Sequence, residues 1–174
     1  LDLFTIRECF GHFDGLKVGI VGDILHSRVA GSLAPALSRL GADVTLIAPP
    51  TLLPARPDVW GVSAAARSGD FDELLPTLDV VYMLRIQQER LNASPFPTLR
   101  EYSMLYGIDA RRLGLLSEHA IIMHPGPVNR GVELTSEAVD TARNLLLYQV
   151  NAGVAVRMAL MYLLLGGSGD DEIA

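Results

Sequence analysis

The hydrophobic pattern of residues 17–50 organises the chain. It begins with an apolar run at 18–21, which is typical of a parallel strand buried on both faces. A polar turn follows, and apolar side chains then recur at the spacing of one helix face: Leu33, Ala36, Leu37 and Leu40. Ser27 is placed as the N-cap of this helix and Gly41 as the residue that ends it. A second apolar run at 43–48 completes a predicted βαβ unit.

The same patterns extend over the rest of the chain. Further strands are predicted at 59–63, 79–84 and 119–123. Further helices are predicted at 1–10, 70–75, 98–106, 109–116 and 144–165. This order predicts an α/β fold, a doubly wound and mostly parallel sheet of four to five strands with helices on both faces.

Composition narrows the class of protein. A length of 174 residues suits one domain with a full core. The net charge of −6, with no basic stripe, argues against a nucleic-acid partner. A single cysteine, Cys9, fits a reducing compartment, and the first residues lack the apolar core of a signal peptide. The longest apolar run, 158–165, is too short to span a bilayer, so we expect a cytoplasmic protein with no membrane partner.

Three predicted strands end in polar turns: 22–28, 85–90 and 124–130. Because the carboxyl ends of parallel strands meet at one edge of the sheet, these turns should form one ligand site. Arg28 and Arg85 follow different strands and can face the same cleft. Paired guanidinium groups fit a ligand with two carboxylates, or with a carboxylate and a phosphate. Gln87 could orient Arg85 or contact the ligand itself.

Other interpretations of these turns stay open on the residues alone. The two arginines could form surface ion pairs with Asp23 and Glu89, which would contribute little to stability. The motifs of dinucleotide-binding folds, phosphate-loop enzymes and serine hydrolases are absent from the sequence. The four histidines and Cys9 lack metal-ligand spacing, so we predict no metal and no cofactor. For His26 and His124, turn-structuring or solvent-exposed roles are favoured over metal ligation.

The same three turns carry a resemblance to a known family. They read GDILHSRVAGSL (22–33), YMLRIQQER (82–90) and HPGPVNRGVE (124–133), and they resemble the aspartate-binding half of the aspartate carbamoyltransferase family. The similarity runs across nearly the whole chain in the right order. The related ornithine carbamoyltransferases carry His-Cys-Leu-Pro at the third turn and a Ser-Met-Gly loop, and this chain has neither.

The resemblance implies a reaction and a set of site residues. The amine of L-aspartate attacks the carbamoyl carbon of carbamoyl phosphate through a tetrahedral intermediate, and phosphate leaves. Arg28 and Arg85 would hold the two carboxylates of aspartate, with Gln87 in support, and Gly126 and Pro127 would present backbone carbonyls to carbamoyl phosphate. No residue of this chain is expected to act as a catalytic nucleophile, because such chemistry depends on positioning and charge stabilisation.

The resemblance also implies that half of the active site lies elsewhere. The family's phosphate-gripping Ser-Thr-Arg-Thr-Ser loop and its His-Pro-Thr-Gln segment are absent, and both belong to a carbamoyl-phosphate domain that builds a homotrimer. We therefore expect the following division: an interdomain helix remnant at 1–10, the aspartate-binding domain at 11–143, a helix packing on the missing domain at 144–165, and a flexible tail at 166–174. The start of the chain resembles a cut inside a helix.

Two functions remain as predictions. The first is an aspartate-binding half-enzyme of pyrimidine biosynthesis that makes N-carbamoyl-L-aspartate only when its missing domain is supplied. The alternative is a non-catalytic binding or assembly module derived from that domain. A nicotinamide-dependent enzyme is a third and poorer fit, because the second predicted strand ends in Ala48-Pro49-Pro50 rather than in an acid.

Overall fold

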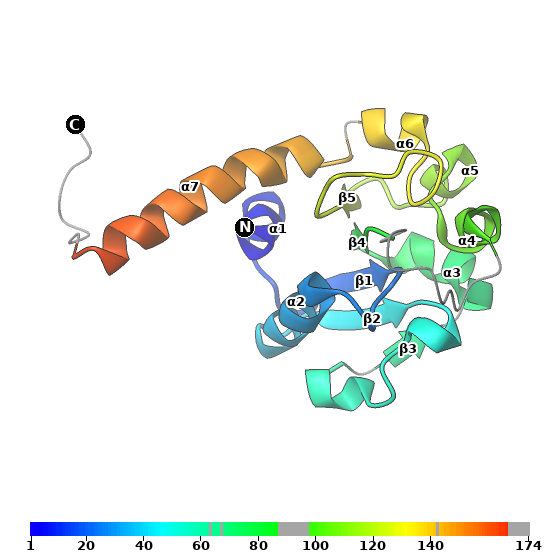
Figure 1. Cartoon of the computed structure of the whole chain (residues 1–174), viewed down its shortest axis with the longest axis horizontal. Helices are drawn as coiled ribbons and strands as arrows, with labels where there is room; N and C mark the ends of the chain where they lie inside the picture. The colour runs from blue at the N-terminus through cyan, green and yellow to red at the C-terminus, as the bar shows by residue number, and fades with distance from the viewer. Residues whose placement is uncertain (63, 67, 87–97, 142, 167–174) are drawn as a thin grey trace.

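The chain folds around a sheet of five parallel strands in the order β3-β2-β1-β4-β5 (Figure 1). The computed structural model describes residues 1–62, 64–66, 68–86, 98–141 and 143–166. The strands are β1 (Lys17–Val21), β2 (Asp43–Ile47), β3 (Ala64–Ala66), β4 (Val80–Met83) and β5 (Ile121–Met123). The predicted α/β class and the parallel sheet are therefore confirmed.

Seven α-helices and three short 3₁₀ helices are described. The α-helices are α1 (Asp2–Phe10), α2 (Arg28–Arg39), α3 (Ser68–Leu74), α4 (Leu99–Tyr106), α5 (Ala110–Leu113), α6 (Ser136–Asp140) and α7 (Leu146–Leu164). The 3₁₀ helices are η1 (Pro50–Leu52), η2 (Pro57–Trp60) and η3 (Leu75–Thr77). Most of the predicted helices therefore form close to their expected positions.

The sheet is buried on both faces, which explains its nearly continuous apolar strands. Ile20 of β1 packs in a core with residues of α1 and α2 on one face. Its neighbour Val21 packs on the other face, in a core with residues of α3, α4 and α6. Both side chains are fully buried. Alternate residues of one strand thus serve two separate cores, as a doubly wound sheet requires.

Strand β1 lies at the centre of the sheet and is the point where the chain changes direction. It pairs with β2 on one side and with β4 on the other, both in parallel. The segments that leave the carboxyl ends of β1 and β4 therefore diverge and leave a crevice between them. Ligands bind at such a crevice in open α/β sheets, so the topology points to the turns after β1 and β4.

The predicted strand at 59–63 is wrong. Residues Pro57–Trp60 form the 3₁₀ helix η2, and Gly61 ends it in a left-handed conformation with φ 72°. Proline at the start of this turn fixes φ and lacks an N–H for strand pairing, so a helical turn is favoured over a strand. The edge strand β3 begins only at Ala64 and pairs with β2 through three residues.

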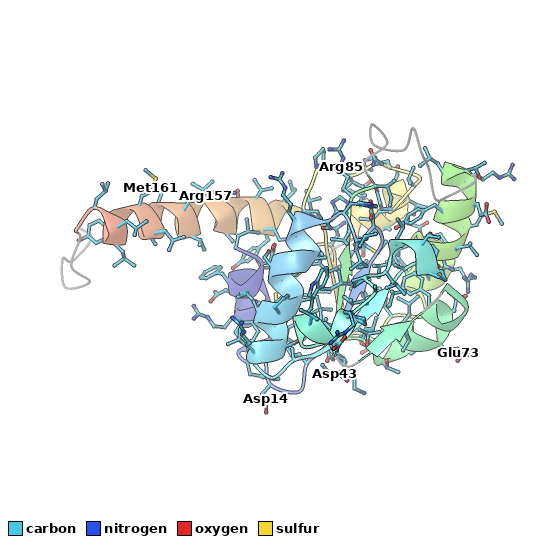
Figure 2. All side chains as sticks on the ribbon, turned by 60° about the horizontal axis from the view of Figure 1, so that its bottom comes forward. Asp14, Asp43, Glu73, Arg85, Arg157 and Met161 are labelled. Carbon is cyan, nitrogen blue, oxygen red and sulfur yellow. The ribbon has the colours of Figure 1, made fainter. Side chains whose placement is uncertain are left out.

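Helix α7 extends away from the sheet, and only its first half lies beside α1 (Figure 1). Its buried residues are Gln149, Ala152 and Gly153. Met161, near its far end, is 62% exposed and lies well away from the sheet in Figure 2. With 19 residues and a mean hydropathy of 1.2, the whole helix is long and apolar enough to cross a membrane, unlike the shorter run considered from the sequence. The same composition suits a helix that packs on another domain.

Candidate functional site

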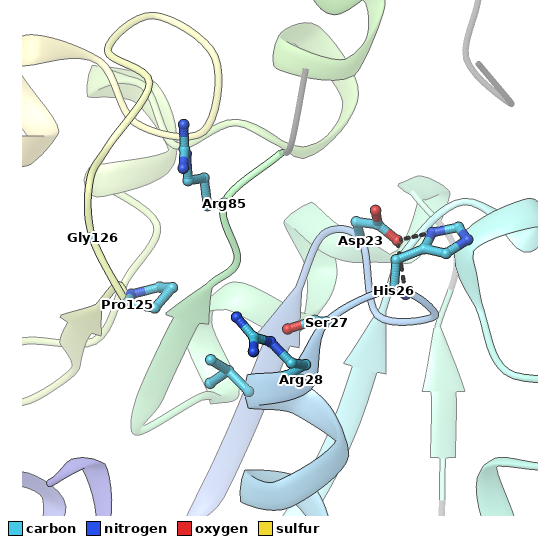
Figure 3. A pocket seen from close by; sticks show the side chains of 8 residues that line it. Asp23, His26, Ser27, Arg28, Arg85, Pro125 and Gly126 are labelled. Atoms are coloured by element: carbon cyan, nitrogen blue, oxygen red, sulfur yellow. Dashed lines mark hydrogen bonds and ion pairs between the residues drawn. The ribbon is translucent and has the colours of Figure 1, made fainter. Parts of the chain in front are cut away.

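A cavity of about 300 Å³ lies at the carboxyl edge of the sheet, where the turns after β1, β4 and β5 meet (Figure 3). Its lining residues are Asp23, His26, Ser27, Arg28, Val29, Arg85, Pro125 and Gly126. Each of the three predicted turns therefore contributes residues to the lining of this one cavity. The structure brings together Arg28, Arg85 and Gly126, which the sequence analysis had selected from separate segments.

Arg28 is held at the cavity by the start of helix α2. Ser27 is the N-cap, and its Oγ accepts a hydrogen bond from the backbone N–H of Ala30 at 3.1 Å. Arg28 is the first residue of the helix, and its guanidinium group extends toward Pro125 in Figure 3. In the part of the chain that the structure describes, no carboxylate pairs with Arg28. A helix N-terminus and a cation side by side favour an anionic ligand.

Asp23 does not form the ion pair with Arg28 that the alternative interpretation required. Its Oδ1 instead accepts from the backbone N–H of His26 at 3.2 Å and lies 2.9 Å from the Nδ1 of the same residue. This contact shapes the turn after β1, so His26 has the turn-structuring role that was predicted for it. Glu89, the other proposed ion-pair partner, and Gln87 lie outside the described residues.

Arg85 follows β4 and is half-buried beside the turn after β5 (Figure 3). Its neighbour Ile86 is clamped to that turn. The backbone N–H of Ile86 donates to Glu133 Oε1 at 2.7 Å, and its carbonyl accepts from Asn129 Nδ2 at 3.0 Å. The backbone at Arg85 is therefore fixed relative to the third turn by contacts of Ile86 rather than by the arginine side chain alone.

Glu133 is the centre of this clamp. The residue is fully buried, and its carboxylate also accepts from the backbone N–H and the Nδ2 of Asn129 at 2.8 and 2.7 Å. Burial raises the pKa of Glu133, while these hydrogen bonds act in the opposite direction. Three N–H donors converge on the two carboxylate oxygens, so only a side chain with two acceptor oxygens satisfies all of them.

We predict that Glu133→Gln lowers the free energy of unfolding by about 1–3 kcal/mol and weakens ligand binding at Arg85. The amide NH₂ of glutamine must face a donor of Ile86 or Asn129, which leaves buried donors without an acceptor. Urea unfolding measures the first effect, and titration with a small dicarboxylic acid measures the second. The exposed Glu137→Gln on α6 is the matched control and should change neither quantity.

The pH dependence of stability gives a second readout for the same variant. Because the pKa of Glu133 is higher in the folded chain, the folded state binds the proton more tightly than the unfolded state. The protonated Glu133 side chain therefore adds to the stability of the wild-type chain below the ordinary pKa of 4.5. This added stability is lost as the pH rises from 4.5 through the folded pKa. Glu133→Gln should remove that slope, and an unchanged slope would contradict the assignment.

His124 structures the turn that follows β5. It is almost completely buried, and its Nδ1 accepts a hydrogen bond from the backbone N–H of Gly126 at 2.9 Å. Burial, together with the charge of Arg85, lowers the pKa of His124 to about 4. The imidazole is therefore neutral at pH 7, and the bond to Nδ1 assigns its proton to Nε2. This confirms the predicted turn-structuring role.

The other predicted residues of this turn take different positions. Gly126 lines the cavity, and its neighbour Pro125 lines it as well. Pro127 is exposed and is not one of the residues that line the cavity. Sequence reasoning did not select Asn129 and Glu133, although both lie in the quoted segment 124–133. The available signal was an acidic residue, Glu133, between the apolar residues Val132 and Leu134.

The cavity combines two arginines with the turn that contains Pro125 and Gly126. In the portions of the chain that are described, no group of three His, Cys, Asp or Glu residues is placed to hold a metal ion. Two guanidinium groups at one cavity favour a small ligand with two anionic groups, while turn carbonyls favour an amine or amide donor.

Comparisons with known proteins agree on one family. The family described as "Aspartate/ornithine carbamoyltransferase, Asp/Orn binding domain" matches residues 14–164. The aspartate carbamoyltransferase catalytic subunit of Thermobifida fusca is 56% identical over 168 residues, which are 97% of this chain and 53% of the relative. The chain thus spans about half the length of the curated relatives that it matches.

Solved structures of aspartate transcarbamoylase from Trypanosoma cruzi are similar over the same extent. The complex with carbamoyl phosphate aligns with a TM-score of 0.79 and 28% identity, covering 92% of this chain and 53% of that one. The complex with N-(phosphonacetyl)-L-aspartic acid aligns with a TM-score of 0.77 and 29% identity over the same shares.

Proposed function

Because this chain belongs to the aspartate/ornithine carbamoyltransferase family, as its Asp/Orn-binding domain, we propose that it is the L-aspartate-binding half of an aspartate carbamoyltransferase. The intact enzyme would make N-carbamoyl-L-aspartate and phosphate from carbamoyl phosphate and L-aspartate. The observation that carries the proposal is the single cavity that Arg28 and Arg85 line together. Relatives named aspartate carbamoyltransferase and a structure with bound carbamoyl phosphate support it.

In this proposal each turn has its own role. Arg28 and Arg85 bind the two carboxylates of L-aspartate, with Gln87 in support, and the carbonyls of Gly126 and Pro127 accept from the amide of carbamoyl phosphate. Held in this way, the aspartate amine attacks the carbamoyl carbon, and phosphate leaves from the tetrahedral intermediate. The reaction needs no covalent nucleophile, because alignment of the two substrates and stabilisation of charge supply the acceleration.

The two arginines that line the cavity favour aspartate over ornithine as the substrate, because Asp23, which also lines it, is engaged by His26. Ornithine carries a second ammonium group where aspartate carries a second carboxylate. An ammonium group placed against Arg28 and Arg85 would experience like-charge repulsion in a partly desolvated site. The family description covers both substrates, and the two arginines select between them.

The missing half of the site would come from an upstream domain that packs on α1 and α7. Eight large apolar residues of α7 are between 53% and 85% exposed: Val154, Met158, Leu160, Met161, Leu163 and Leu164, with Leu147 and Val150 near its start. An apolar face of this kind is costly in water and suits burial against a partner domain. We propose that residues 1–10 and 144–165 are the two connections to that domain, in a cytoplasmic homotrimer.

Reassembly from two halves tests this function. We expect no product from the chain alone and N-carbamoyl-L-aspartate once the chain is mixed with a separately produced carbamoyl-phosphate domain, measured by a colorimetric or mass-spectrometric assay. Val154→Lys on α7 should prevent assembly, because it introduces a charge into the proposed contact. Met104→Lys, at an apolar position on α4 that is even more exposed, is the matched control and should assemble normally.

The alternative is a non-catalytic assembly module. It predicts a complex of the two halves without product and without any aspartate-induced change at Arg28 or Arg85 in an amide spectrum. A mixture that forms product contradicts it. A complex that neither makes product nor binds aspartate contradicts the half-enzyme.

A further inference from the structure

Gln149 is a buried polar residue in a mostly apolar helix. Its side chain is almost fully buried, and both ends of its amide are hydrogen-bonded. The Oε1 atom accepts from the backbone N–H of His124 at 3.0 Å, and the Nε2 atom donates to Asp2 Oδ1 at 2.9 Å. One side chain therefore joins three segments that are distant in sequence: helix α1, helix α7 and the turn after β5.

The hydrogen bonds continue from Gln149 to the candidate site. His124, which accepts from the N–H of Gly126, lies between them. Gly126 lines the cavity that contains Arg28 and Arg85. The series Asp2–Gln149–His124–Gly126 therefore runs without a gap from the first turn of α1 to the cavity wall. We call these four residues the turn relay.

A second cavity of about 310 Å³ lies along the turn relay and is bordered by all four of its members. It shares Val29, Pro125 and Gly126 with the first cavity, so the relay lies between the candidate site and residues of α1 and α7. Tyr82 of β4 also borders this second cavity, and burial, with the nearby Asp2 carboxylate, raises the pKa of its hydroxyl. Within the relay, His124 and Gln149 are almost completely buried.

A buried amide is expensive unless both of its polar ends are satisfied. An apolar side chain at position 149 would pack in α7 without this requirement. The glutamine therefore contributes through its directed hydrogen bonds, and these bonds fix the backbone at His124 relative to the two helices. The position of the turn then depends on how α1 and α7 are held.

We propose that Gln149 is a positioning residue that sets the turn at 124–126 according to the packing of α1 and α7. This inference rests on the proposed function, in which the upstream domain packs on the two helices and the carbonyls of this turn contact carbamoyl phosphate. Packing of the missing half on α1 and α7 then completes the substrate site through the turn relay as well as by adding residues of its own.

Reversing one hydrogen bond of the relay tests its role. Gln149→Glu keeps an acceptor for the N–H of His124 but loses the donor to Asp2 and places two carboxylates together. In reassembled enzyme we expect the KM for carbamoyl phosphate to rise about five- to tenfold, while the KM for L-aspartate changes less than about twofold. The double variant Asp2→Asn/Gln149→Glu restores the bond with opposite polarity, since the Asn amide now donates. It should return the KM for carbamoyl phosphate to within about twofold of wild type.

The control is Asp2→Asn alone, which retains an acceptor oxygen for Gln149 and should remain close to wild type. The Gly126 amide resonance of the chain alone is the second readout, and it should shift in Gln149→Glu and return in the double variant. Equal KM values for the single and double variants, or an unmoved Gly126 resonance, would overturn the relay. Wild-type halves that make no product would refute the proposed function, while the Gly126 resonance would still test the relay.

Discussion

Arg85→Ala is expected to weaken the binding of L-aspartate by about 10- to 100-fold. Hydrogen bonds from a guanidinium group to a carboxylate contribute about 1.5–3 kcal/mol, and a bidentate contact lies at the upper end of that range. Arg85 is half-buried at the cavity, so solvent screens this contact less than it would a surface pair. Arg28→Ala should have a smaller effect, because Arg28 is exposed and the start of α2 continues to attract the anion.

Titration of the chain with L-aspartate, followed by amide chemical shifts, measures this loss. The KM for aspartate in reassembled enzyme should rise by a similar factor. Arg56→Ala is the matched control, because Arg56 is exposed, pairs with Asp58 at 2.7 Å and does not line the cavity. It removes the same charge and should leave affinity unchanged. Equal affinity of wild type and Arg85→Ala would favour the non-catalytic module.

Arg112→Met is expected to destabilise the fold by about 3–5 kcal/mol, although it lies outside the cavity. Arg112 is 5% exposed. It donates to the carbonyls of Gly107 and Leu105 at 2.7 and 3.1 Å and to Asp72 at 2.7 Å, with its guanidinium 5.0 Å from the Phe71 ring centroid. Methionine retains the apolar volume but removes the donor to the carbonyls of Gly107 and Leu105, and Asp72 keeps only its contact with Arg111. The loss of hydrogen bonds to these carbonyls is the costly part of the change.

Urea unfolding of Arg112→Met and Arg111→Met compares the loss of a buried arginine with the loss of an exposed arginine of the same charge. Arg111 contacts the same carboxylate at 2.8 Å but is 57% exposed, so its loss should cost less than about 1 kcal/mol. Burial raises the pKa of Asp72, yet hydrogen bonds from the two arginines outweigh it and lower that pKa below its ordinary value of 3.8. The stability that Asp72 contributes is present above that value and is lost as the pH falls through the folded pKa. Equal losses in both variants would contradict this account.

The central βαβ unit could be predicted because local signals agree there. Ser27 caps α2, Gly41 follows it in a left-handed conformation with φ 89°, and apolar runs bound the helix on both sides. The edge strand β3 could not be predicted, because it consists of three alanines, Ala64–Ala66, and lacks the large apolar or β-branched residues that indicate a strand. It forms by pairing with β2, which is a tertiary effect.

In the site, too, some residues could be predicted from the sequence pattern, whereas others depend on contacts between distant segments. Parallel topology alone predicts that Arg28 and Arg85 lie at one edge, and the structure places both at one cavity. The residues that hold the turns depend on contacts between distant segments. Glu133 meets Ile86 across 47 positions, and Gln149 meets Asp2 across 147. No pattern within a short window identifies such pairs, although a lone glutamine in the apolar segment LLLYQV was a visible anomaly.

The central place of β1 has a consequence for the order in which the domain assembles. Pairing of β1 with β2 closes a short loop across one helix, whereas pairing of β1 with β4 must wait for a much longer segment to return. Chain entropy makes the first pairing easier than the second. Arg28 and Arg85 lie on either side of this later seam, so a partly folded chain holds one arginine in place without its counterpart. An anion bridging the two arginines would therefore stabilise the pairing of β1 with β4, the later of these two steps.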